Sequence, residues 1–202
     1  MQLQIPFFPQ RTHLDCGTCA LRMVLAYFGR DLGIETLIEK TGIKEGKALH
    51  TIQIATAATS LGYKSKFYSK TMNFNEQSLE HEFYKKYGVD MNIEASNLRI
   101  SEAKKVGVEI EEKTFPLEEL LGFLTEESIP IVLLDWSIVK GTEEKGYQGH
   151  FVPIVGYDET NVYVHNQGLS NPQSFLPIKR EVFDKSRKAS GTDEDVAIIY
   201  KN

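Results

Sequence analysis

Cysteine is scarce in this sequence. Only Cys16 and Cys19 occur among its 202 residues. Two thiols in one short loop cannot cross-link a domain of this size, so the sequence excludes a disulfide scaffold. The same scarcity favours a reducing compartment, the cytoplasm, and we expect the two thiols to have a chemical or a packing role.

Positive charge and long apolar runs are also lacking. Lysine and arginine total 23 against 28 acidic residues, which gives a net charge of -5. Nucleic acid is therefore not an expected partner, because binding to its phosphates needs a basic surface. The longest apolar run, 129–134, contains a proline and is far shorter than the roughly 20 residues of a membrane-spanning helix. The sequence predicts no membrane span, and its start lacks the pattern of a cleaved secretory signal.

What remains is the composition of an ordinary globular protein. Hydrophobic residues make up 41% of the chain and charged residues 25%, close to the averages for soluble domains. At roughly 150 residues per domain, the length predicts a single domain over 1–202.

Helical periodicity dominates the first half of the chain. Apolar residues recur at helical spacing after Cys16 and stop at Gly29, which predicts a buried helix with Cys16 in its first turn. Further helices are predicted at about 34–41 and 49–61, followed by a strand at 63–68. Segment 71–106 is more polar. We interpret it as a helical insertion or cap, with helices at 76–87 and 97–106.

Strand signals dominate the second half. Strands 150–157 and 161–166 flank a short polar turn and predict a hairpin. The other predicted elements are strand 106–112, helix 116–127, strand 129–135, helix 179–188 and strand 196–200. Helices come first and a hairpin-rich sheet second, so the predicted fold class is α+β.

Cys16 is the first candidate for chemistry. A thiol at the start of a helix faces unpaired backbone N–H groups and the positive end of the helix dipole, and both favour the thiolate. Gln10 lies close enough upstream to donate its side-chain amide beside the Cys16 backbone N–H, and together they would form an oxyanion hole. The alternative is that Cys16 is a small buried hydrophobic residue.

His150 and Asn166 form the second candidate cluster. His150 begins one strand of the predicted hairpin and Asn166 ends the other, so both side chains are expected at one edge of the sheet. The chain order Cys, His, Asn and the wide separation of Cys16 from His150 are typical of papain-like enzymes. In that arrangement His150 is the base and Asn166 orients its ring. Taken singly, each residue would more often be structural.

The two cysteines allow two other interpretations. Cys16 and Cys19 form a C-x-x-C pair, as in thioredoxin-like redox proteins, although no buried strand precedes it here. The two thiols could also hold zinc with His150 and His165, if all four side chains converge. Both alternatives leave Asn166 without a role, and we expect Cys19 to face the core.

Two charged segments stand near the C-terminus. The acidic run 193–195 could bind a metal, but a solvated loop before the last strand is the favoured interpretation. The basic residues of 179–188 are interpreted as one solvated helix face; they are Lys179, Arg180, Lys185, Arg187 and Lys188. Three histidines are assigned no role: His13, His50 and His81.

Five motifs in order resemble a known family. They are Gln10, DCGTCALRMVLAYFG (15–29), YQGHFVPIVGYD (147–158), VHNQG (164–168) and GTDED (191–195). Together they resemble the guanylyl cyclase domain-containing proteins over nearly the whole chain. More distantly they resemble the papain-like peptidases that trim double-glycine leaders from bacteriocins. Those peptidases commonly have Asp, in an Asp-Pro pair, where this chain has Asn166.

The two resemblances imply different functions. The peptidase resemblance implies a papain-like fold and a thiol hydrolase acting on a peptide or protein, with Cys16, His150, Asn166 and Gln10 as its site. The other implies the synthesis of cyclic GMP from GTP, yet the chain has no glycine-rich phosphate loop. We expect the thiol enzyme, with neither a cofactor nor a metal. A cyclase and a non-catalytic binding module remain the alternatives.

Overall fold

A mixed sheet forms the centre of the molecule. The computed structural model describes residues 1–72 and 76–201. Within them the strands are β1 (Lys64–Ser69), β2 (Glu109–Glu112), β3 (Ser128–Asp135), β4 (Gly149–Tyr157), β5 (Asn161–Asn166), β6 (Gln173–Lys179) and β7 (Val196–Tyr200). They form one sheet in the order β2-β1-β7-β3-β4-β5-β6. Only β1 and β2 pair in parallel.

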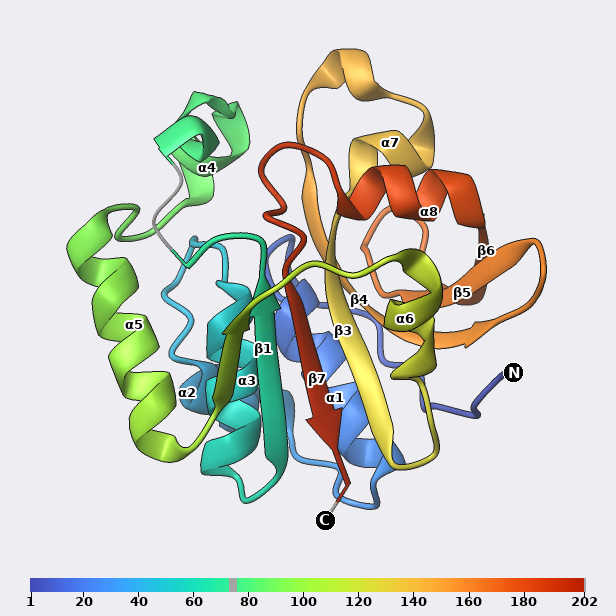
Figure 1. The fold of residues 1–202 in the computed structure, drawn as a ribbon, viewed down its shortest axis with the longest axis horizontal. Coiled ribbons are helices and arrows are strands. Elements are labelled where there is room, and N and C mark those ends of the chain that lie inside the picture. The colour runs from blue at the N-terminus through green and yellow to red at the C-terminus, as the bar shows by residue number, and fades with distance from the viewer. Residues whose placement is uncertain (73–75, 202) are drawn as a thin grey trace.

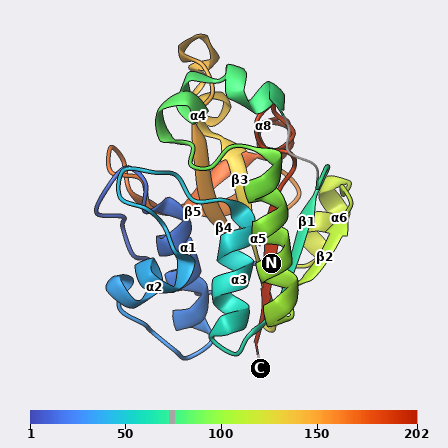
Figure 2. The same cartoon turned by 90° about the vertical axis from the view of Figure 1, so that its left-hand side faces the viewer.

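Helices cover both faces of this sheet (Figures 1 and 2). The α-helices are α1 (Cys16–Tyr27), α2 (Ile34–Thr41), α3 (Thr51–Ser60), α4 (Glu82–Tyr87), α5 (Ile93–Val106), α6 (Leu117–Gly122), α7 (Trp136–Lys140) and α8 (Arg180–Arg187), with short 3-10 turns at Glu76–Glu80 and Glu143–Lys145. One face carries α1 and α3, with α2 and α5 packed outside them, and the other carries α8. Because both faces are covered, every residue of the central strand β3 is buried.

The α+β class and the predicted hairpin are confirmed, since β4 and β5 pair antiparallel. Two elements escaped prediction. Strand β6 carries Pro177, which a sheet accepts here because β6 is an edge strand. Helix α7 has only five residues and depends on Asp135, whose side chain accepts the Ser137 N–H at 3.0 Å.

Two predicted helix boundaries were wrong. The helix expected over 116–127 ends at Gly122, because the Ser128 hydroxyl bonds the Phe123 carbonyl at 2.7 Å and turns the chain into β3. The helix expected from 97 begins at Ile93, because the Asn92 side chain caps it by accepting the Ala95 N–H. Residues 73–75 of the predicted insertion 71–106 lie outside the described residues. In its described part the helix expected over 76–87 is divided into a 3-10 turn and α4, and α5 packs on α3.

The basic helix face was also interpreted incorrectly at one position. Arg187 of α8 is only 4% exposed. Its guanidinium pairs with Asp184 and Glu194 and donates to the Phe115 carbonyl at 2.7 Å. The helical periodicity predicted that this side chain is exposed to solvent. Its guanidinium instead bonds residues before α6 and before β7, and so connects α8 to both segments. None of the helices in the described residues is long and apolar enough to cross a membrane.

Replacing Arg187 by methionine is expected to lower the free energy of unfolding by about 3–5 kcal/mol, because removing one partner of a buried ion pair leaves Glu194 uncompensated. Lys185→Met is the matched control: Lys185 is an exposed residue of the same helix, so a change within about 0.5 kcal/mol is expected. Urea unfolding followed by circular dichroism measures both, and equal effects would contradict the buried role of Arg187.

Candidate active site

Cys16 is the first residue of α1, and the turn before it sets its position. The Asp15 carboxylate accepts hydrogen bonds from the Thr12 N–H at 3.2 Å and the Thr12 hydroxyl at 2.6 Å. The helix then approaches β4 closely, because a Cβ on Gly17 would lie 3.1 Å from the Phe151 ring. Cys16 is 9% exposed at the wall of a small pocket whose lining includes His13, Leu49 and Phe151.

Burial has the largest effect on the Cys16 thiol and raises its pKa. The backbone N–H groups of Phe151 and Gly17 bond the sulfur and act in the opposite direction. The net direction is opposite to the one expected from a helix start, because desolvation of the thiolate outweighs the N–H groups. The Phe151 bond also places the sulfur beside β4, one residue after His150.

His150 and Asn166 are in direct contact. The His150 Nε2 lies 3.1 Å from the Asn166 Oδ1, and both side chains are buried. The contact follows from the topology, because His150 begins β4 and Asn166 ends its neighbour β5. The structure thus brings together two of the four residues singled out in the sequence.

The orientation of the Asn166 amide determines which nitrogen of His150 carries the proton. Oδ1 also accepts the Gly168 N–H at 3.0 Å, and Nδ2 donates to the Asn171 carbonyl at 2.6 Å. A backbone N–H can only donate and a carbonyl can only accept, so the amide cannot be reversed. The His150 Nε2 must therefore carry the proton, and the lone pair of the neutral ring lies on Nδ1.

The surroundings keep His150 uncharged. Burial lowers its pKa to about 4, while the Asn166 bond acts in the opposite direction. The ring of Trp136 packs edge-on against the imidazole with the two centroids 4.6 Å apart. Because the Cys16 pKa is raised and the His150 pKa is lowered, the resting state is a neutral thiol and a neutral imidazole.

Gln167 joins the segments that carry the candidate residues. Its Nε2 donates to the Cys16 carbonyl at 2.9 Å and also to the Phe151 carbonyl. The backbone carbonyl of Gln167 accepts the backbone N–H of Gln10 at 2.9 Å. The residue is fully buried. A single side chain and its backbone therefore hold α1, β4 and the N-terminal segment at the end of β5.

Gln10 departs from the expected geometry in one respect. Its Nε2 donates to the Thr12 carbonyl at 2.6 Å, so one of the two amide protons is used locally. Its Oε1 is buried and accepts no hydrogen bond from the described residues. Only the second Nε2 proton is left for an oxyanion.

Cys19 and His165 have structural surroundings. Cys19 is 2% exposed, and burial raises its pKa to about 12. The His165 Nε2 bonds the Ile5 carbonyl, and its Nδ1 accepts the Phe175 N–H. Both cysteines are free thiols. Among residues 1–72 and 76–201, no three histidine, cysteine or acidic side chains are grouped so that they could hold a metal.

Sequence reasoning missed three residues of this site. Trp136 covers His150, His13 lines the Cys16 pocket, and Gln167 ties the segments together. His13 and Trp136 gave no usable signal, because loop residues beside a site can be placed only once the fold is known. Gln167 was visible as the residue after Asn166, but its glutamine-glycine pair suggested only a turn.

Solved structures with this architecture are papain-like peptidases. A double glycine motif protease from an AMS/PCAT transporter, in complex with its leader peptide, is 18% identical with a TM-score of 0.58, over 99% of this chain and 93% of that one. The peptidase domain of Streptococcus ComA is 14% identical with a TM-score of 0.54, over 98% and 100%. The similarity establishes the fold, and the expected papain-like fold is confirmed.

The family follows from the sequence comparison. A family model described as guanylylate cyclase matches residues 5–199, and the chain belongs to this family. Guanylyl cyclase 1 of Arabidopsis thaliana is 24% identical in an alignment of 210 positions, which covers 98% of this chain and 76% of that protein. Both resemblances expected from the motifs are therefore confirmed.

The His150 ring is expected to stay neutral, with its proton on Nε2, until the pH falls to about 4. Asn166→Ala should move the titration midpoint lower, because the Asn166 bond raises the His150 pKa, whereas Asn171→Ala should leave it unchanged, since only the Asn171 backbone is used. Nitrogen-15 NMR of the imidazole measures both the tautomer and the midpoint. A midpoint near 6.5, or a proton on Nδ1, would contradict the assignment.

Gln167→Met keeps the length of the side chain but removes both hydrogen bonds to α1 and β4. Each bond contributes about 0.5–1.5 kcal/mol, so the free energy of unfolding should fall by about 1–3 kcal/mol. Gln148→Met is the control, because Gln148 bonds only the flexible Lys140 through its side chain. Urea unfolding checks the two values. A Gln167 variant as stable as the control would contradict the joining role.

Proposed function

We propose that the protein is a papain-like thiol hydrolase with Cys16 as nucleophile and His150 as base. The observation that carries the proposal is the fixed Asn166 amide, which holds the His150 proton on Nε2 and leaves Nδ1 as a proton acceptor. The sulfur lies beside Phe151, the next residue along β4.

The proposed reaction is acyl transfer from an amide. The Cys16 sulfur attacks the carbonyl carbon while its proton passes to the His150 Nδ1, and a carbon–sulfur bond forms. His150 then returns the proton to the leaving amine as the carbon–nitrogen bond breaks. Water, deprotonated by the same nitrogen, attacks the thioester and releases the acid and the thiol. Asn166 holds the imidazolium that forms in each step.

Oxyanion stabilisation comes from the start of α1. The Cys16 N–H stands in the first helical turn, where backbone donors have no partner inside the helix. The second Nε2 proton of Gln10 is the other donor that we assign to the oxyanion. The carbonyl bond to Thr12 holds the Gln10 amide in place, so it needs little reorganisation during the reaction.

The proposed substrate is a peptide or protein. The structural relative with a TM-score of 0.58 is in complex with a leader peptide. A thiol at the wall of a pocket suits a substrate whose extended chain lies across that pocket. Deamidation or transamidation would use the same residues. We place the reaction in the cytoplasm, where both thiols stay reduced.

The family name supports a second candidate function, the synthesis of cyclic GMP from GTP. Such a reaction requires the triphosphate charge to be neutralised and a ribose hydroxyl to be activated, and it has no use for a thiol. The two candidates therefore respond in opposite ways to removal of the Cys16 sulfur. A binding module without catalysis would respond to neither assay.

Cys16→Ala is expected to abolish reaction with a thiol-directed acyl probe and cleavage of a peptide library, a loss of at least about a thousandfold. Cys19→Ala is the matched control and should retain both activities, because its buried thiol lies outside the mechanism. Intact mass spectrometry locates the acyl group. In parallel, both variants are incubated with GTP and magnesium or manganese.

Three outcomes would overturn the proposal. Metal-dependent cyclic GMP from the Cys16→Ala variant would establish the cyclase. Absence of both activities in the unmodified protein would favour a binding module. Labelling of Cys19 instead of Cys16 would refute the nucleophile assignment.

A further inference from the structure

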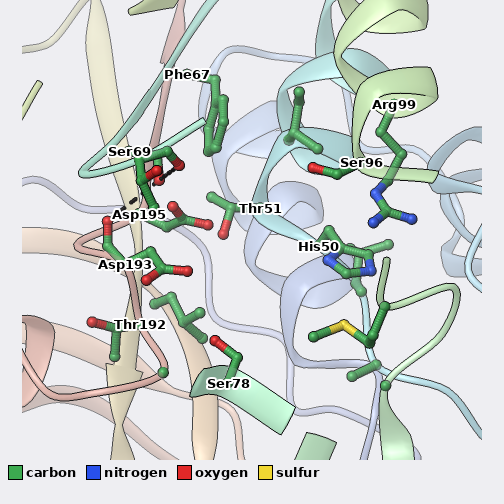
Figure 3. Close-up of a pocket in the computed structure, with 18 of the residues that line it drawn as sticks. His50, Thr51, Phe67, Ser69, Ser78, Ser96, Arg99, Thr192, Asp193 and Asp195 are labelled. Carbon is green, nitrogen blue, oxygen red and sulfur yellow. Dashed lines mark hydrogen bonds between the residues drawn. The ribbon is translucent and has the colours of Figure 1, made fainter. Parts of the chain in front are cut away.

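A second cavity adjoins the pocket of Cys16. It has a volume of about 110 Å³ and lies between the start of α3, the end of β1, the loop before β7, and α5 (Figure 3). Four residues line both spaces: Ala48, Leu49, Tyr84 and Leu133. A group bound in the cavity would therefore lie next to the thiol.

One wall of the cavity is acidic and incompletely hydrogen-bonded. The Asp195 Oδ1 is buried, and it accepts no hydrogen bond from the described residues. Thr51 is 1% exposed, and its hydroxyl lies beside the Asp195 carboxyl. Figure 3 shows both side chains on the same side of the cavity, with Ser69 and Asp193 beside them. Unused acceptors at a cavity wall indicate a ligand that donates hydrogen bonds.

The charge on the lining favours a cation. Asp193, Asp195 and Arg99 contribute charged groups to the lining, and Asp193 has an interaction of its own, so the acceptor left over is the Asp195 Oδ1. Arg99 interacts with Asp90 and Glu102 outside the cavity lining. His50 carries no charge at neutral pH, because burial lowers its pKa to about 4, and its Nε2 bonds the Val89 carbonyl.

Burial also raises the pKa of the Asp195 carboxyl to about 7, although the Thr51 and Ser69 hydroxyls act in the opposite direction. A cation at this carboxyl would offset part of the desolvation. The acidic run at 193–195 is therefore not simply the solvated loop that the sequence suggested, because at Asp195 it forms a cavity wall.

The rest of the lining is mixed, with hydroxyl side chains such as Ser78, Ser96 and Thr192 beside an apolar part. Leu49, Phe67, Ile100 and Leu133 contribute to it. Apolar walls that end at a carboxyl match a side chain with a hydrocarbon stem and a charged head, which is the chemistry of lysine and arginine.

We propose that this cavity binds a basic side chain of the peptide substrate, with its cationic head against Asp195. The inference rests on the proposed thiol function, and it adds a preference for peptide substrates that carry a lysine or arginine. Because the cavity adjoins the Cys16 pocket, the basic residue is the one whose carbonyl the thiol attacks.

Two thiol-directed probes test this preference. They are the acyloxymethyl ketones of N-acetyl-lysine and N-acetyl-norleucine, which have the same number of side-chain carbons and differ in the amine. Cys16 should react at least tenfold faster with the lysine probe. Asp195→Asn should remove that preference without slowing the norleucine probe, and Thr51→Val should reduce it partly. Glu111→Gln, with the same change of charge on the exposed strand β2, should leave it unchanged.

A binding measurement separates this inference from the thiol mechanism. N-acetyl-lysine methylamide is titrated into the Cys16→Ala protein and followed by NMR, with the norleucine analogue as the control. Saturable binding of the lysine compound alone, abolished by Asp195→Asn, supports the cavity even if Cys16 proves unreactive. Equal binding or equal reaction rates of the two compounds, or a lysine preference that survives in Asp195→Asn, would overturn the inference. Reaction of Cys16 with both probes at one rate would leave the thiol mechanism intact.

Discussion

The hydrogen bonds of Gln167 are the interaction on which the geometry of the site depends. Cys16 lies on a helix that is distant in sequence from the hairpin of His150 and Asn166, so its position relative to them is fixed only by contacts between those elements. The Gln167 amide bonds the carbonyl of Cys16 and that of Phe151, the neighbour of His150, while its own position follows from that of Asn166. A displacement of β5 would therefore move Asn166, His150 and Cys16 together.

The second constraint is desolvation. A thiol at a helix start is expected to ionise easily, but Cys16 and His150 are both buried, and the raised pKa of one and the lowered pKa of the other oppose charge separation. The neutral pair is the stable resting state, so in the proposed mechanism the thiolate forms only as the proton moves to Nδ1 during attack. Such a thiol would react slowly with small alkylating agents and faster with a ligand that stabilises the developing charge.

The sequence predicted the features that depend on local patterns. The helix after Asp15, the β4–β5 hairpin and the α+β class follow from periodicity and turn residues, and the proximity of His150 to Asn166 follows from the hairpin. It could not predict features that depend on tertiary packing. The pattern of α8 predicts an exposed face for its basic residues. Arg187 is buried all the same, because Phe115 and Glu194 from two other segments bond its guanidinium. The sequence around Asp195 is typical of a loop, but residues of β1 and α3 lie beside it and together they line a cavity.

The fold and the family name point to different chemistries, and a fold alone does not decide a function. The feature that separates the two chemistries is the fixed orientation of the Asn166 and His150 side chains. A Cβ at Gly168 would lie 3.0 Å from the Asn166 Oδ1, so the backbone N–H reaches that oxygen because the residue is glycine. Asn166 is held by three hydrogen bonds, and Trp136 covers the ring that it orients. In the proposed mechanism the remaining nitrogen of His150, Nδ1, accepts the thiol proton, whereas the synthesis of a cyclic nucleotide gives this histidine no role. The constraint therefore favours the thiol enzyme.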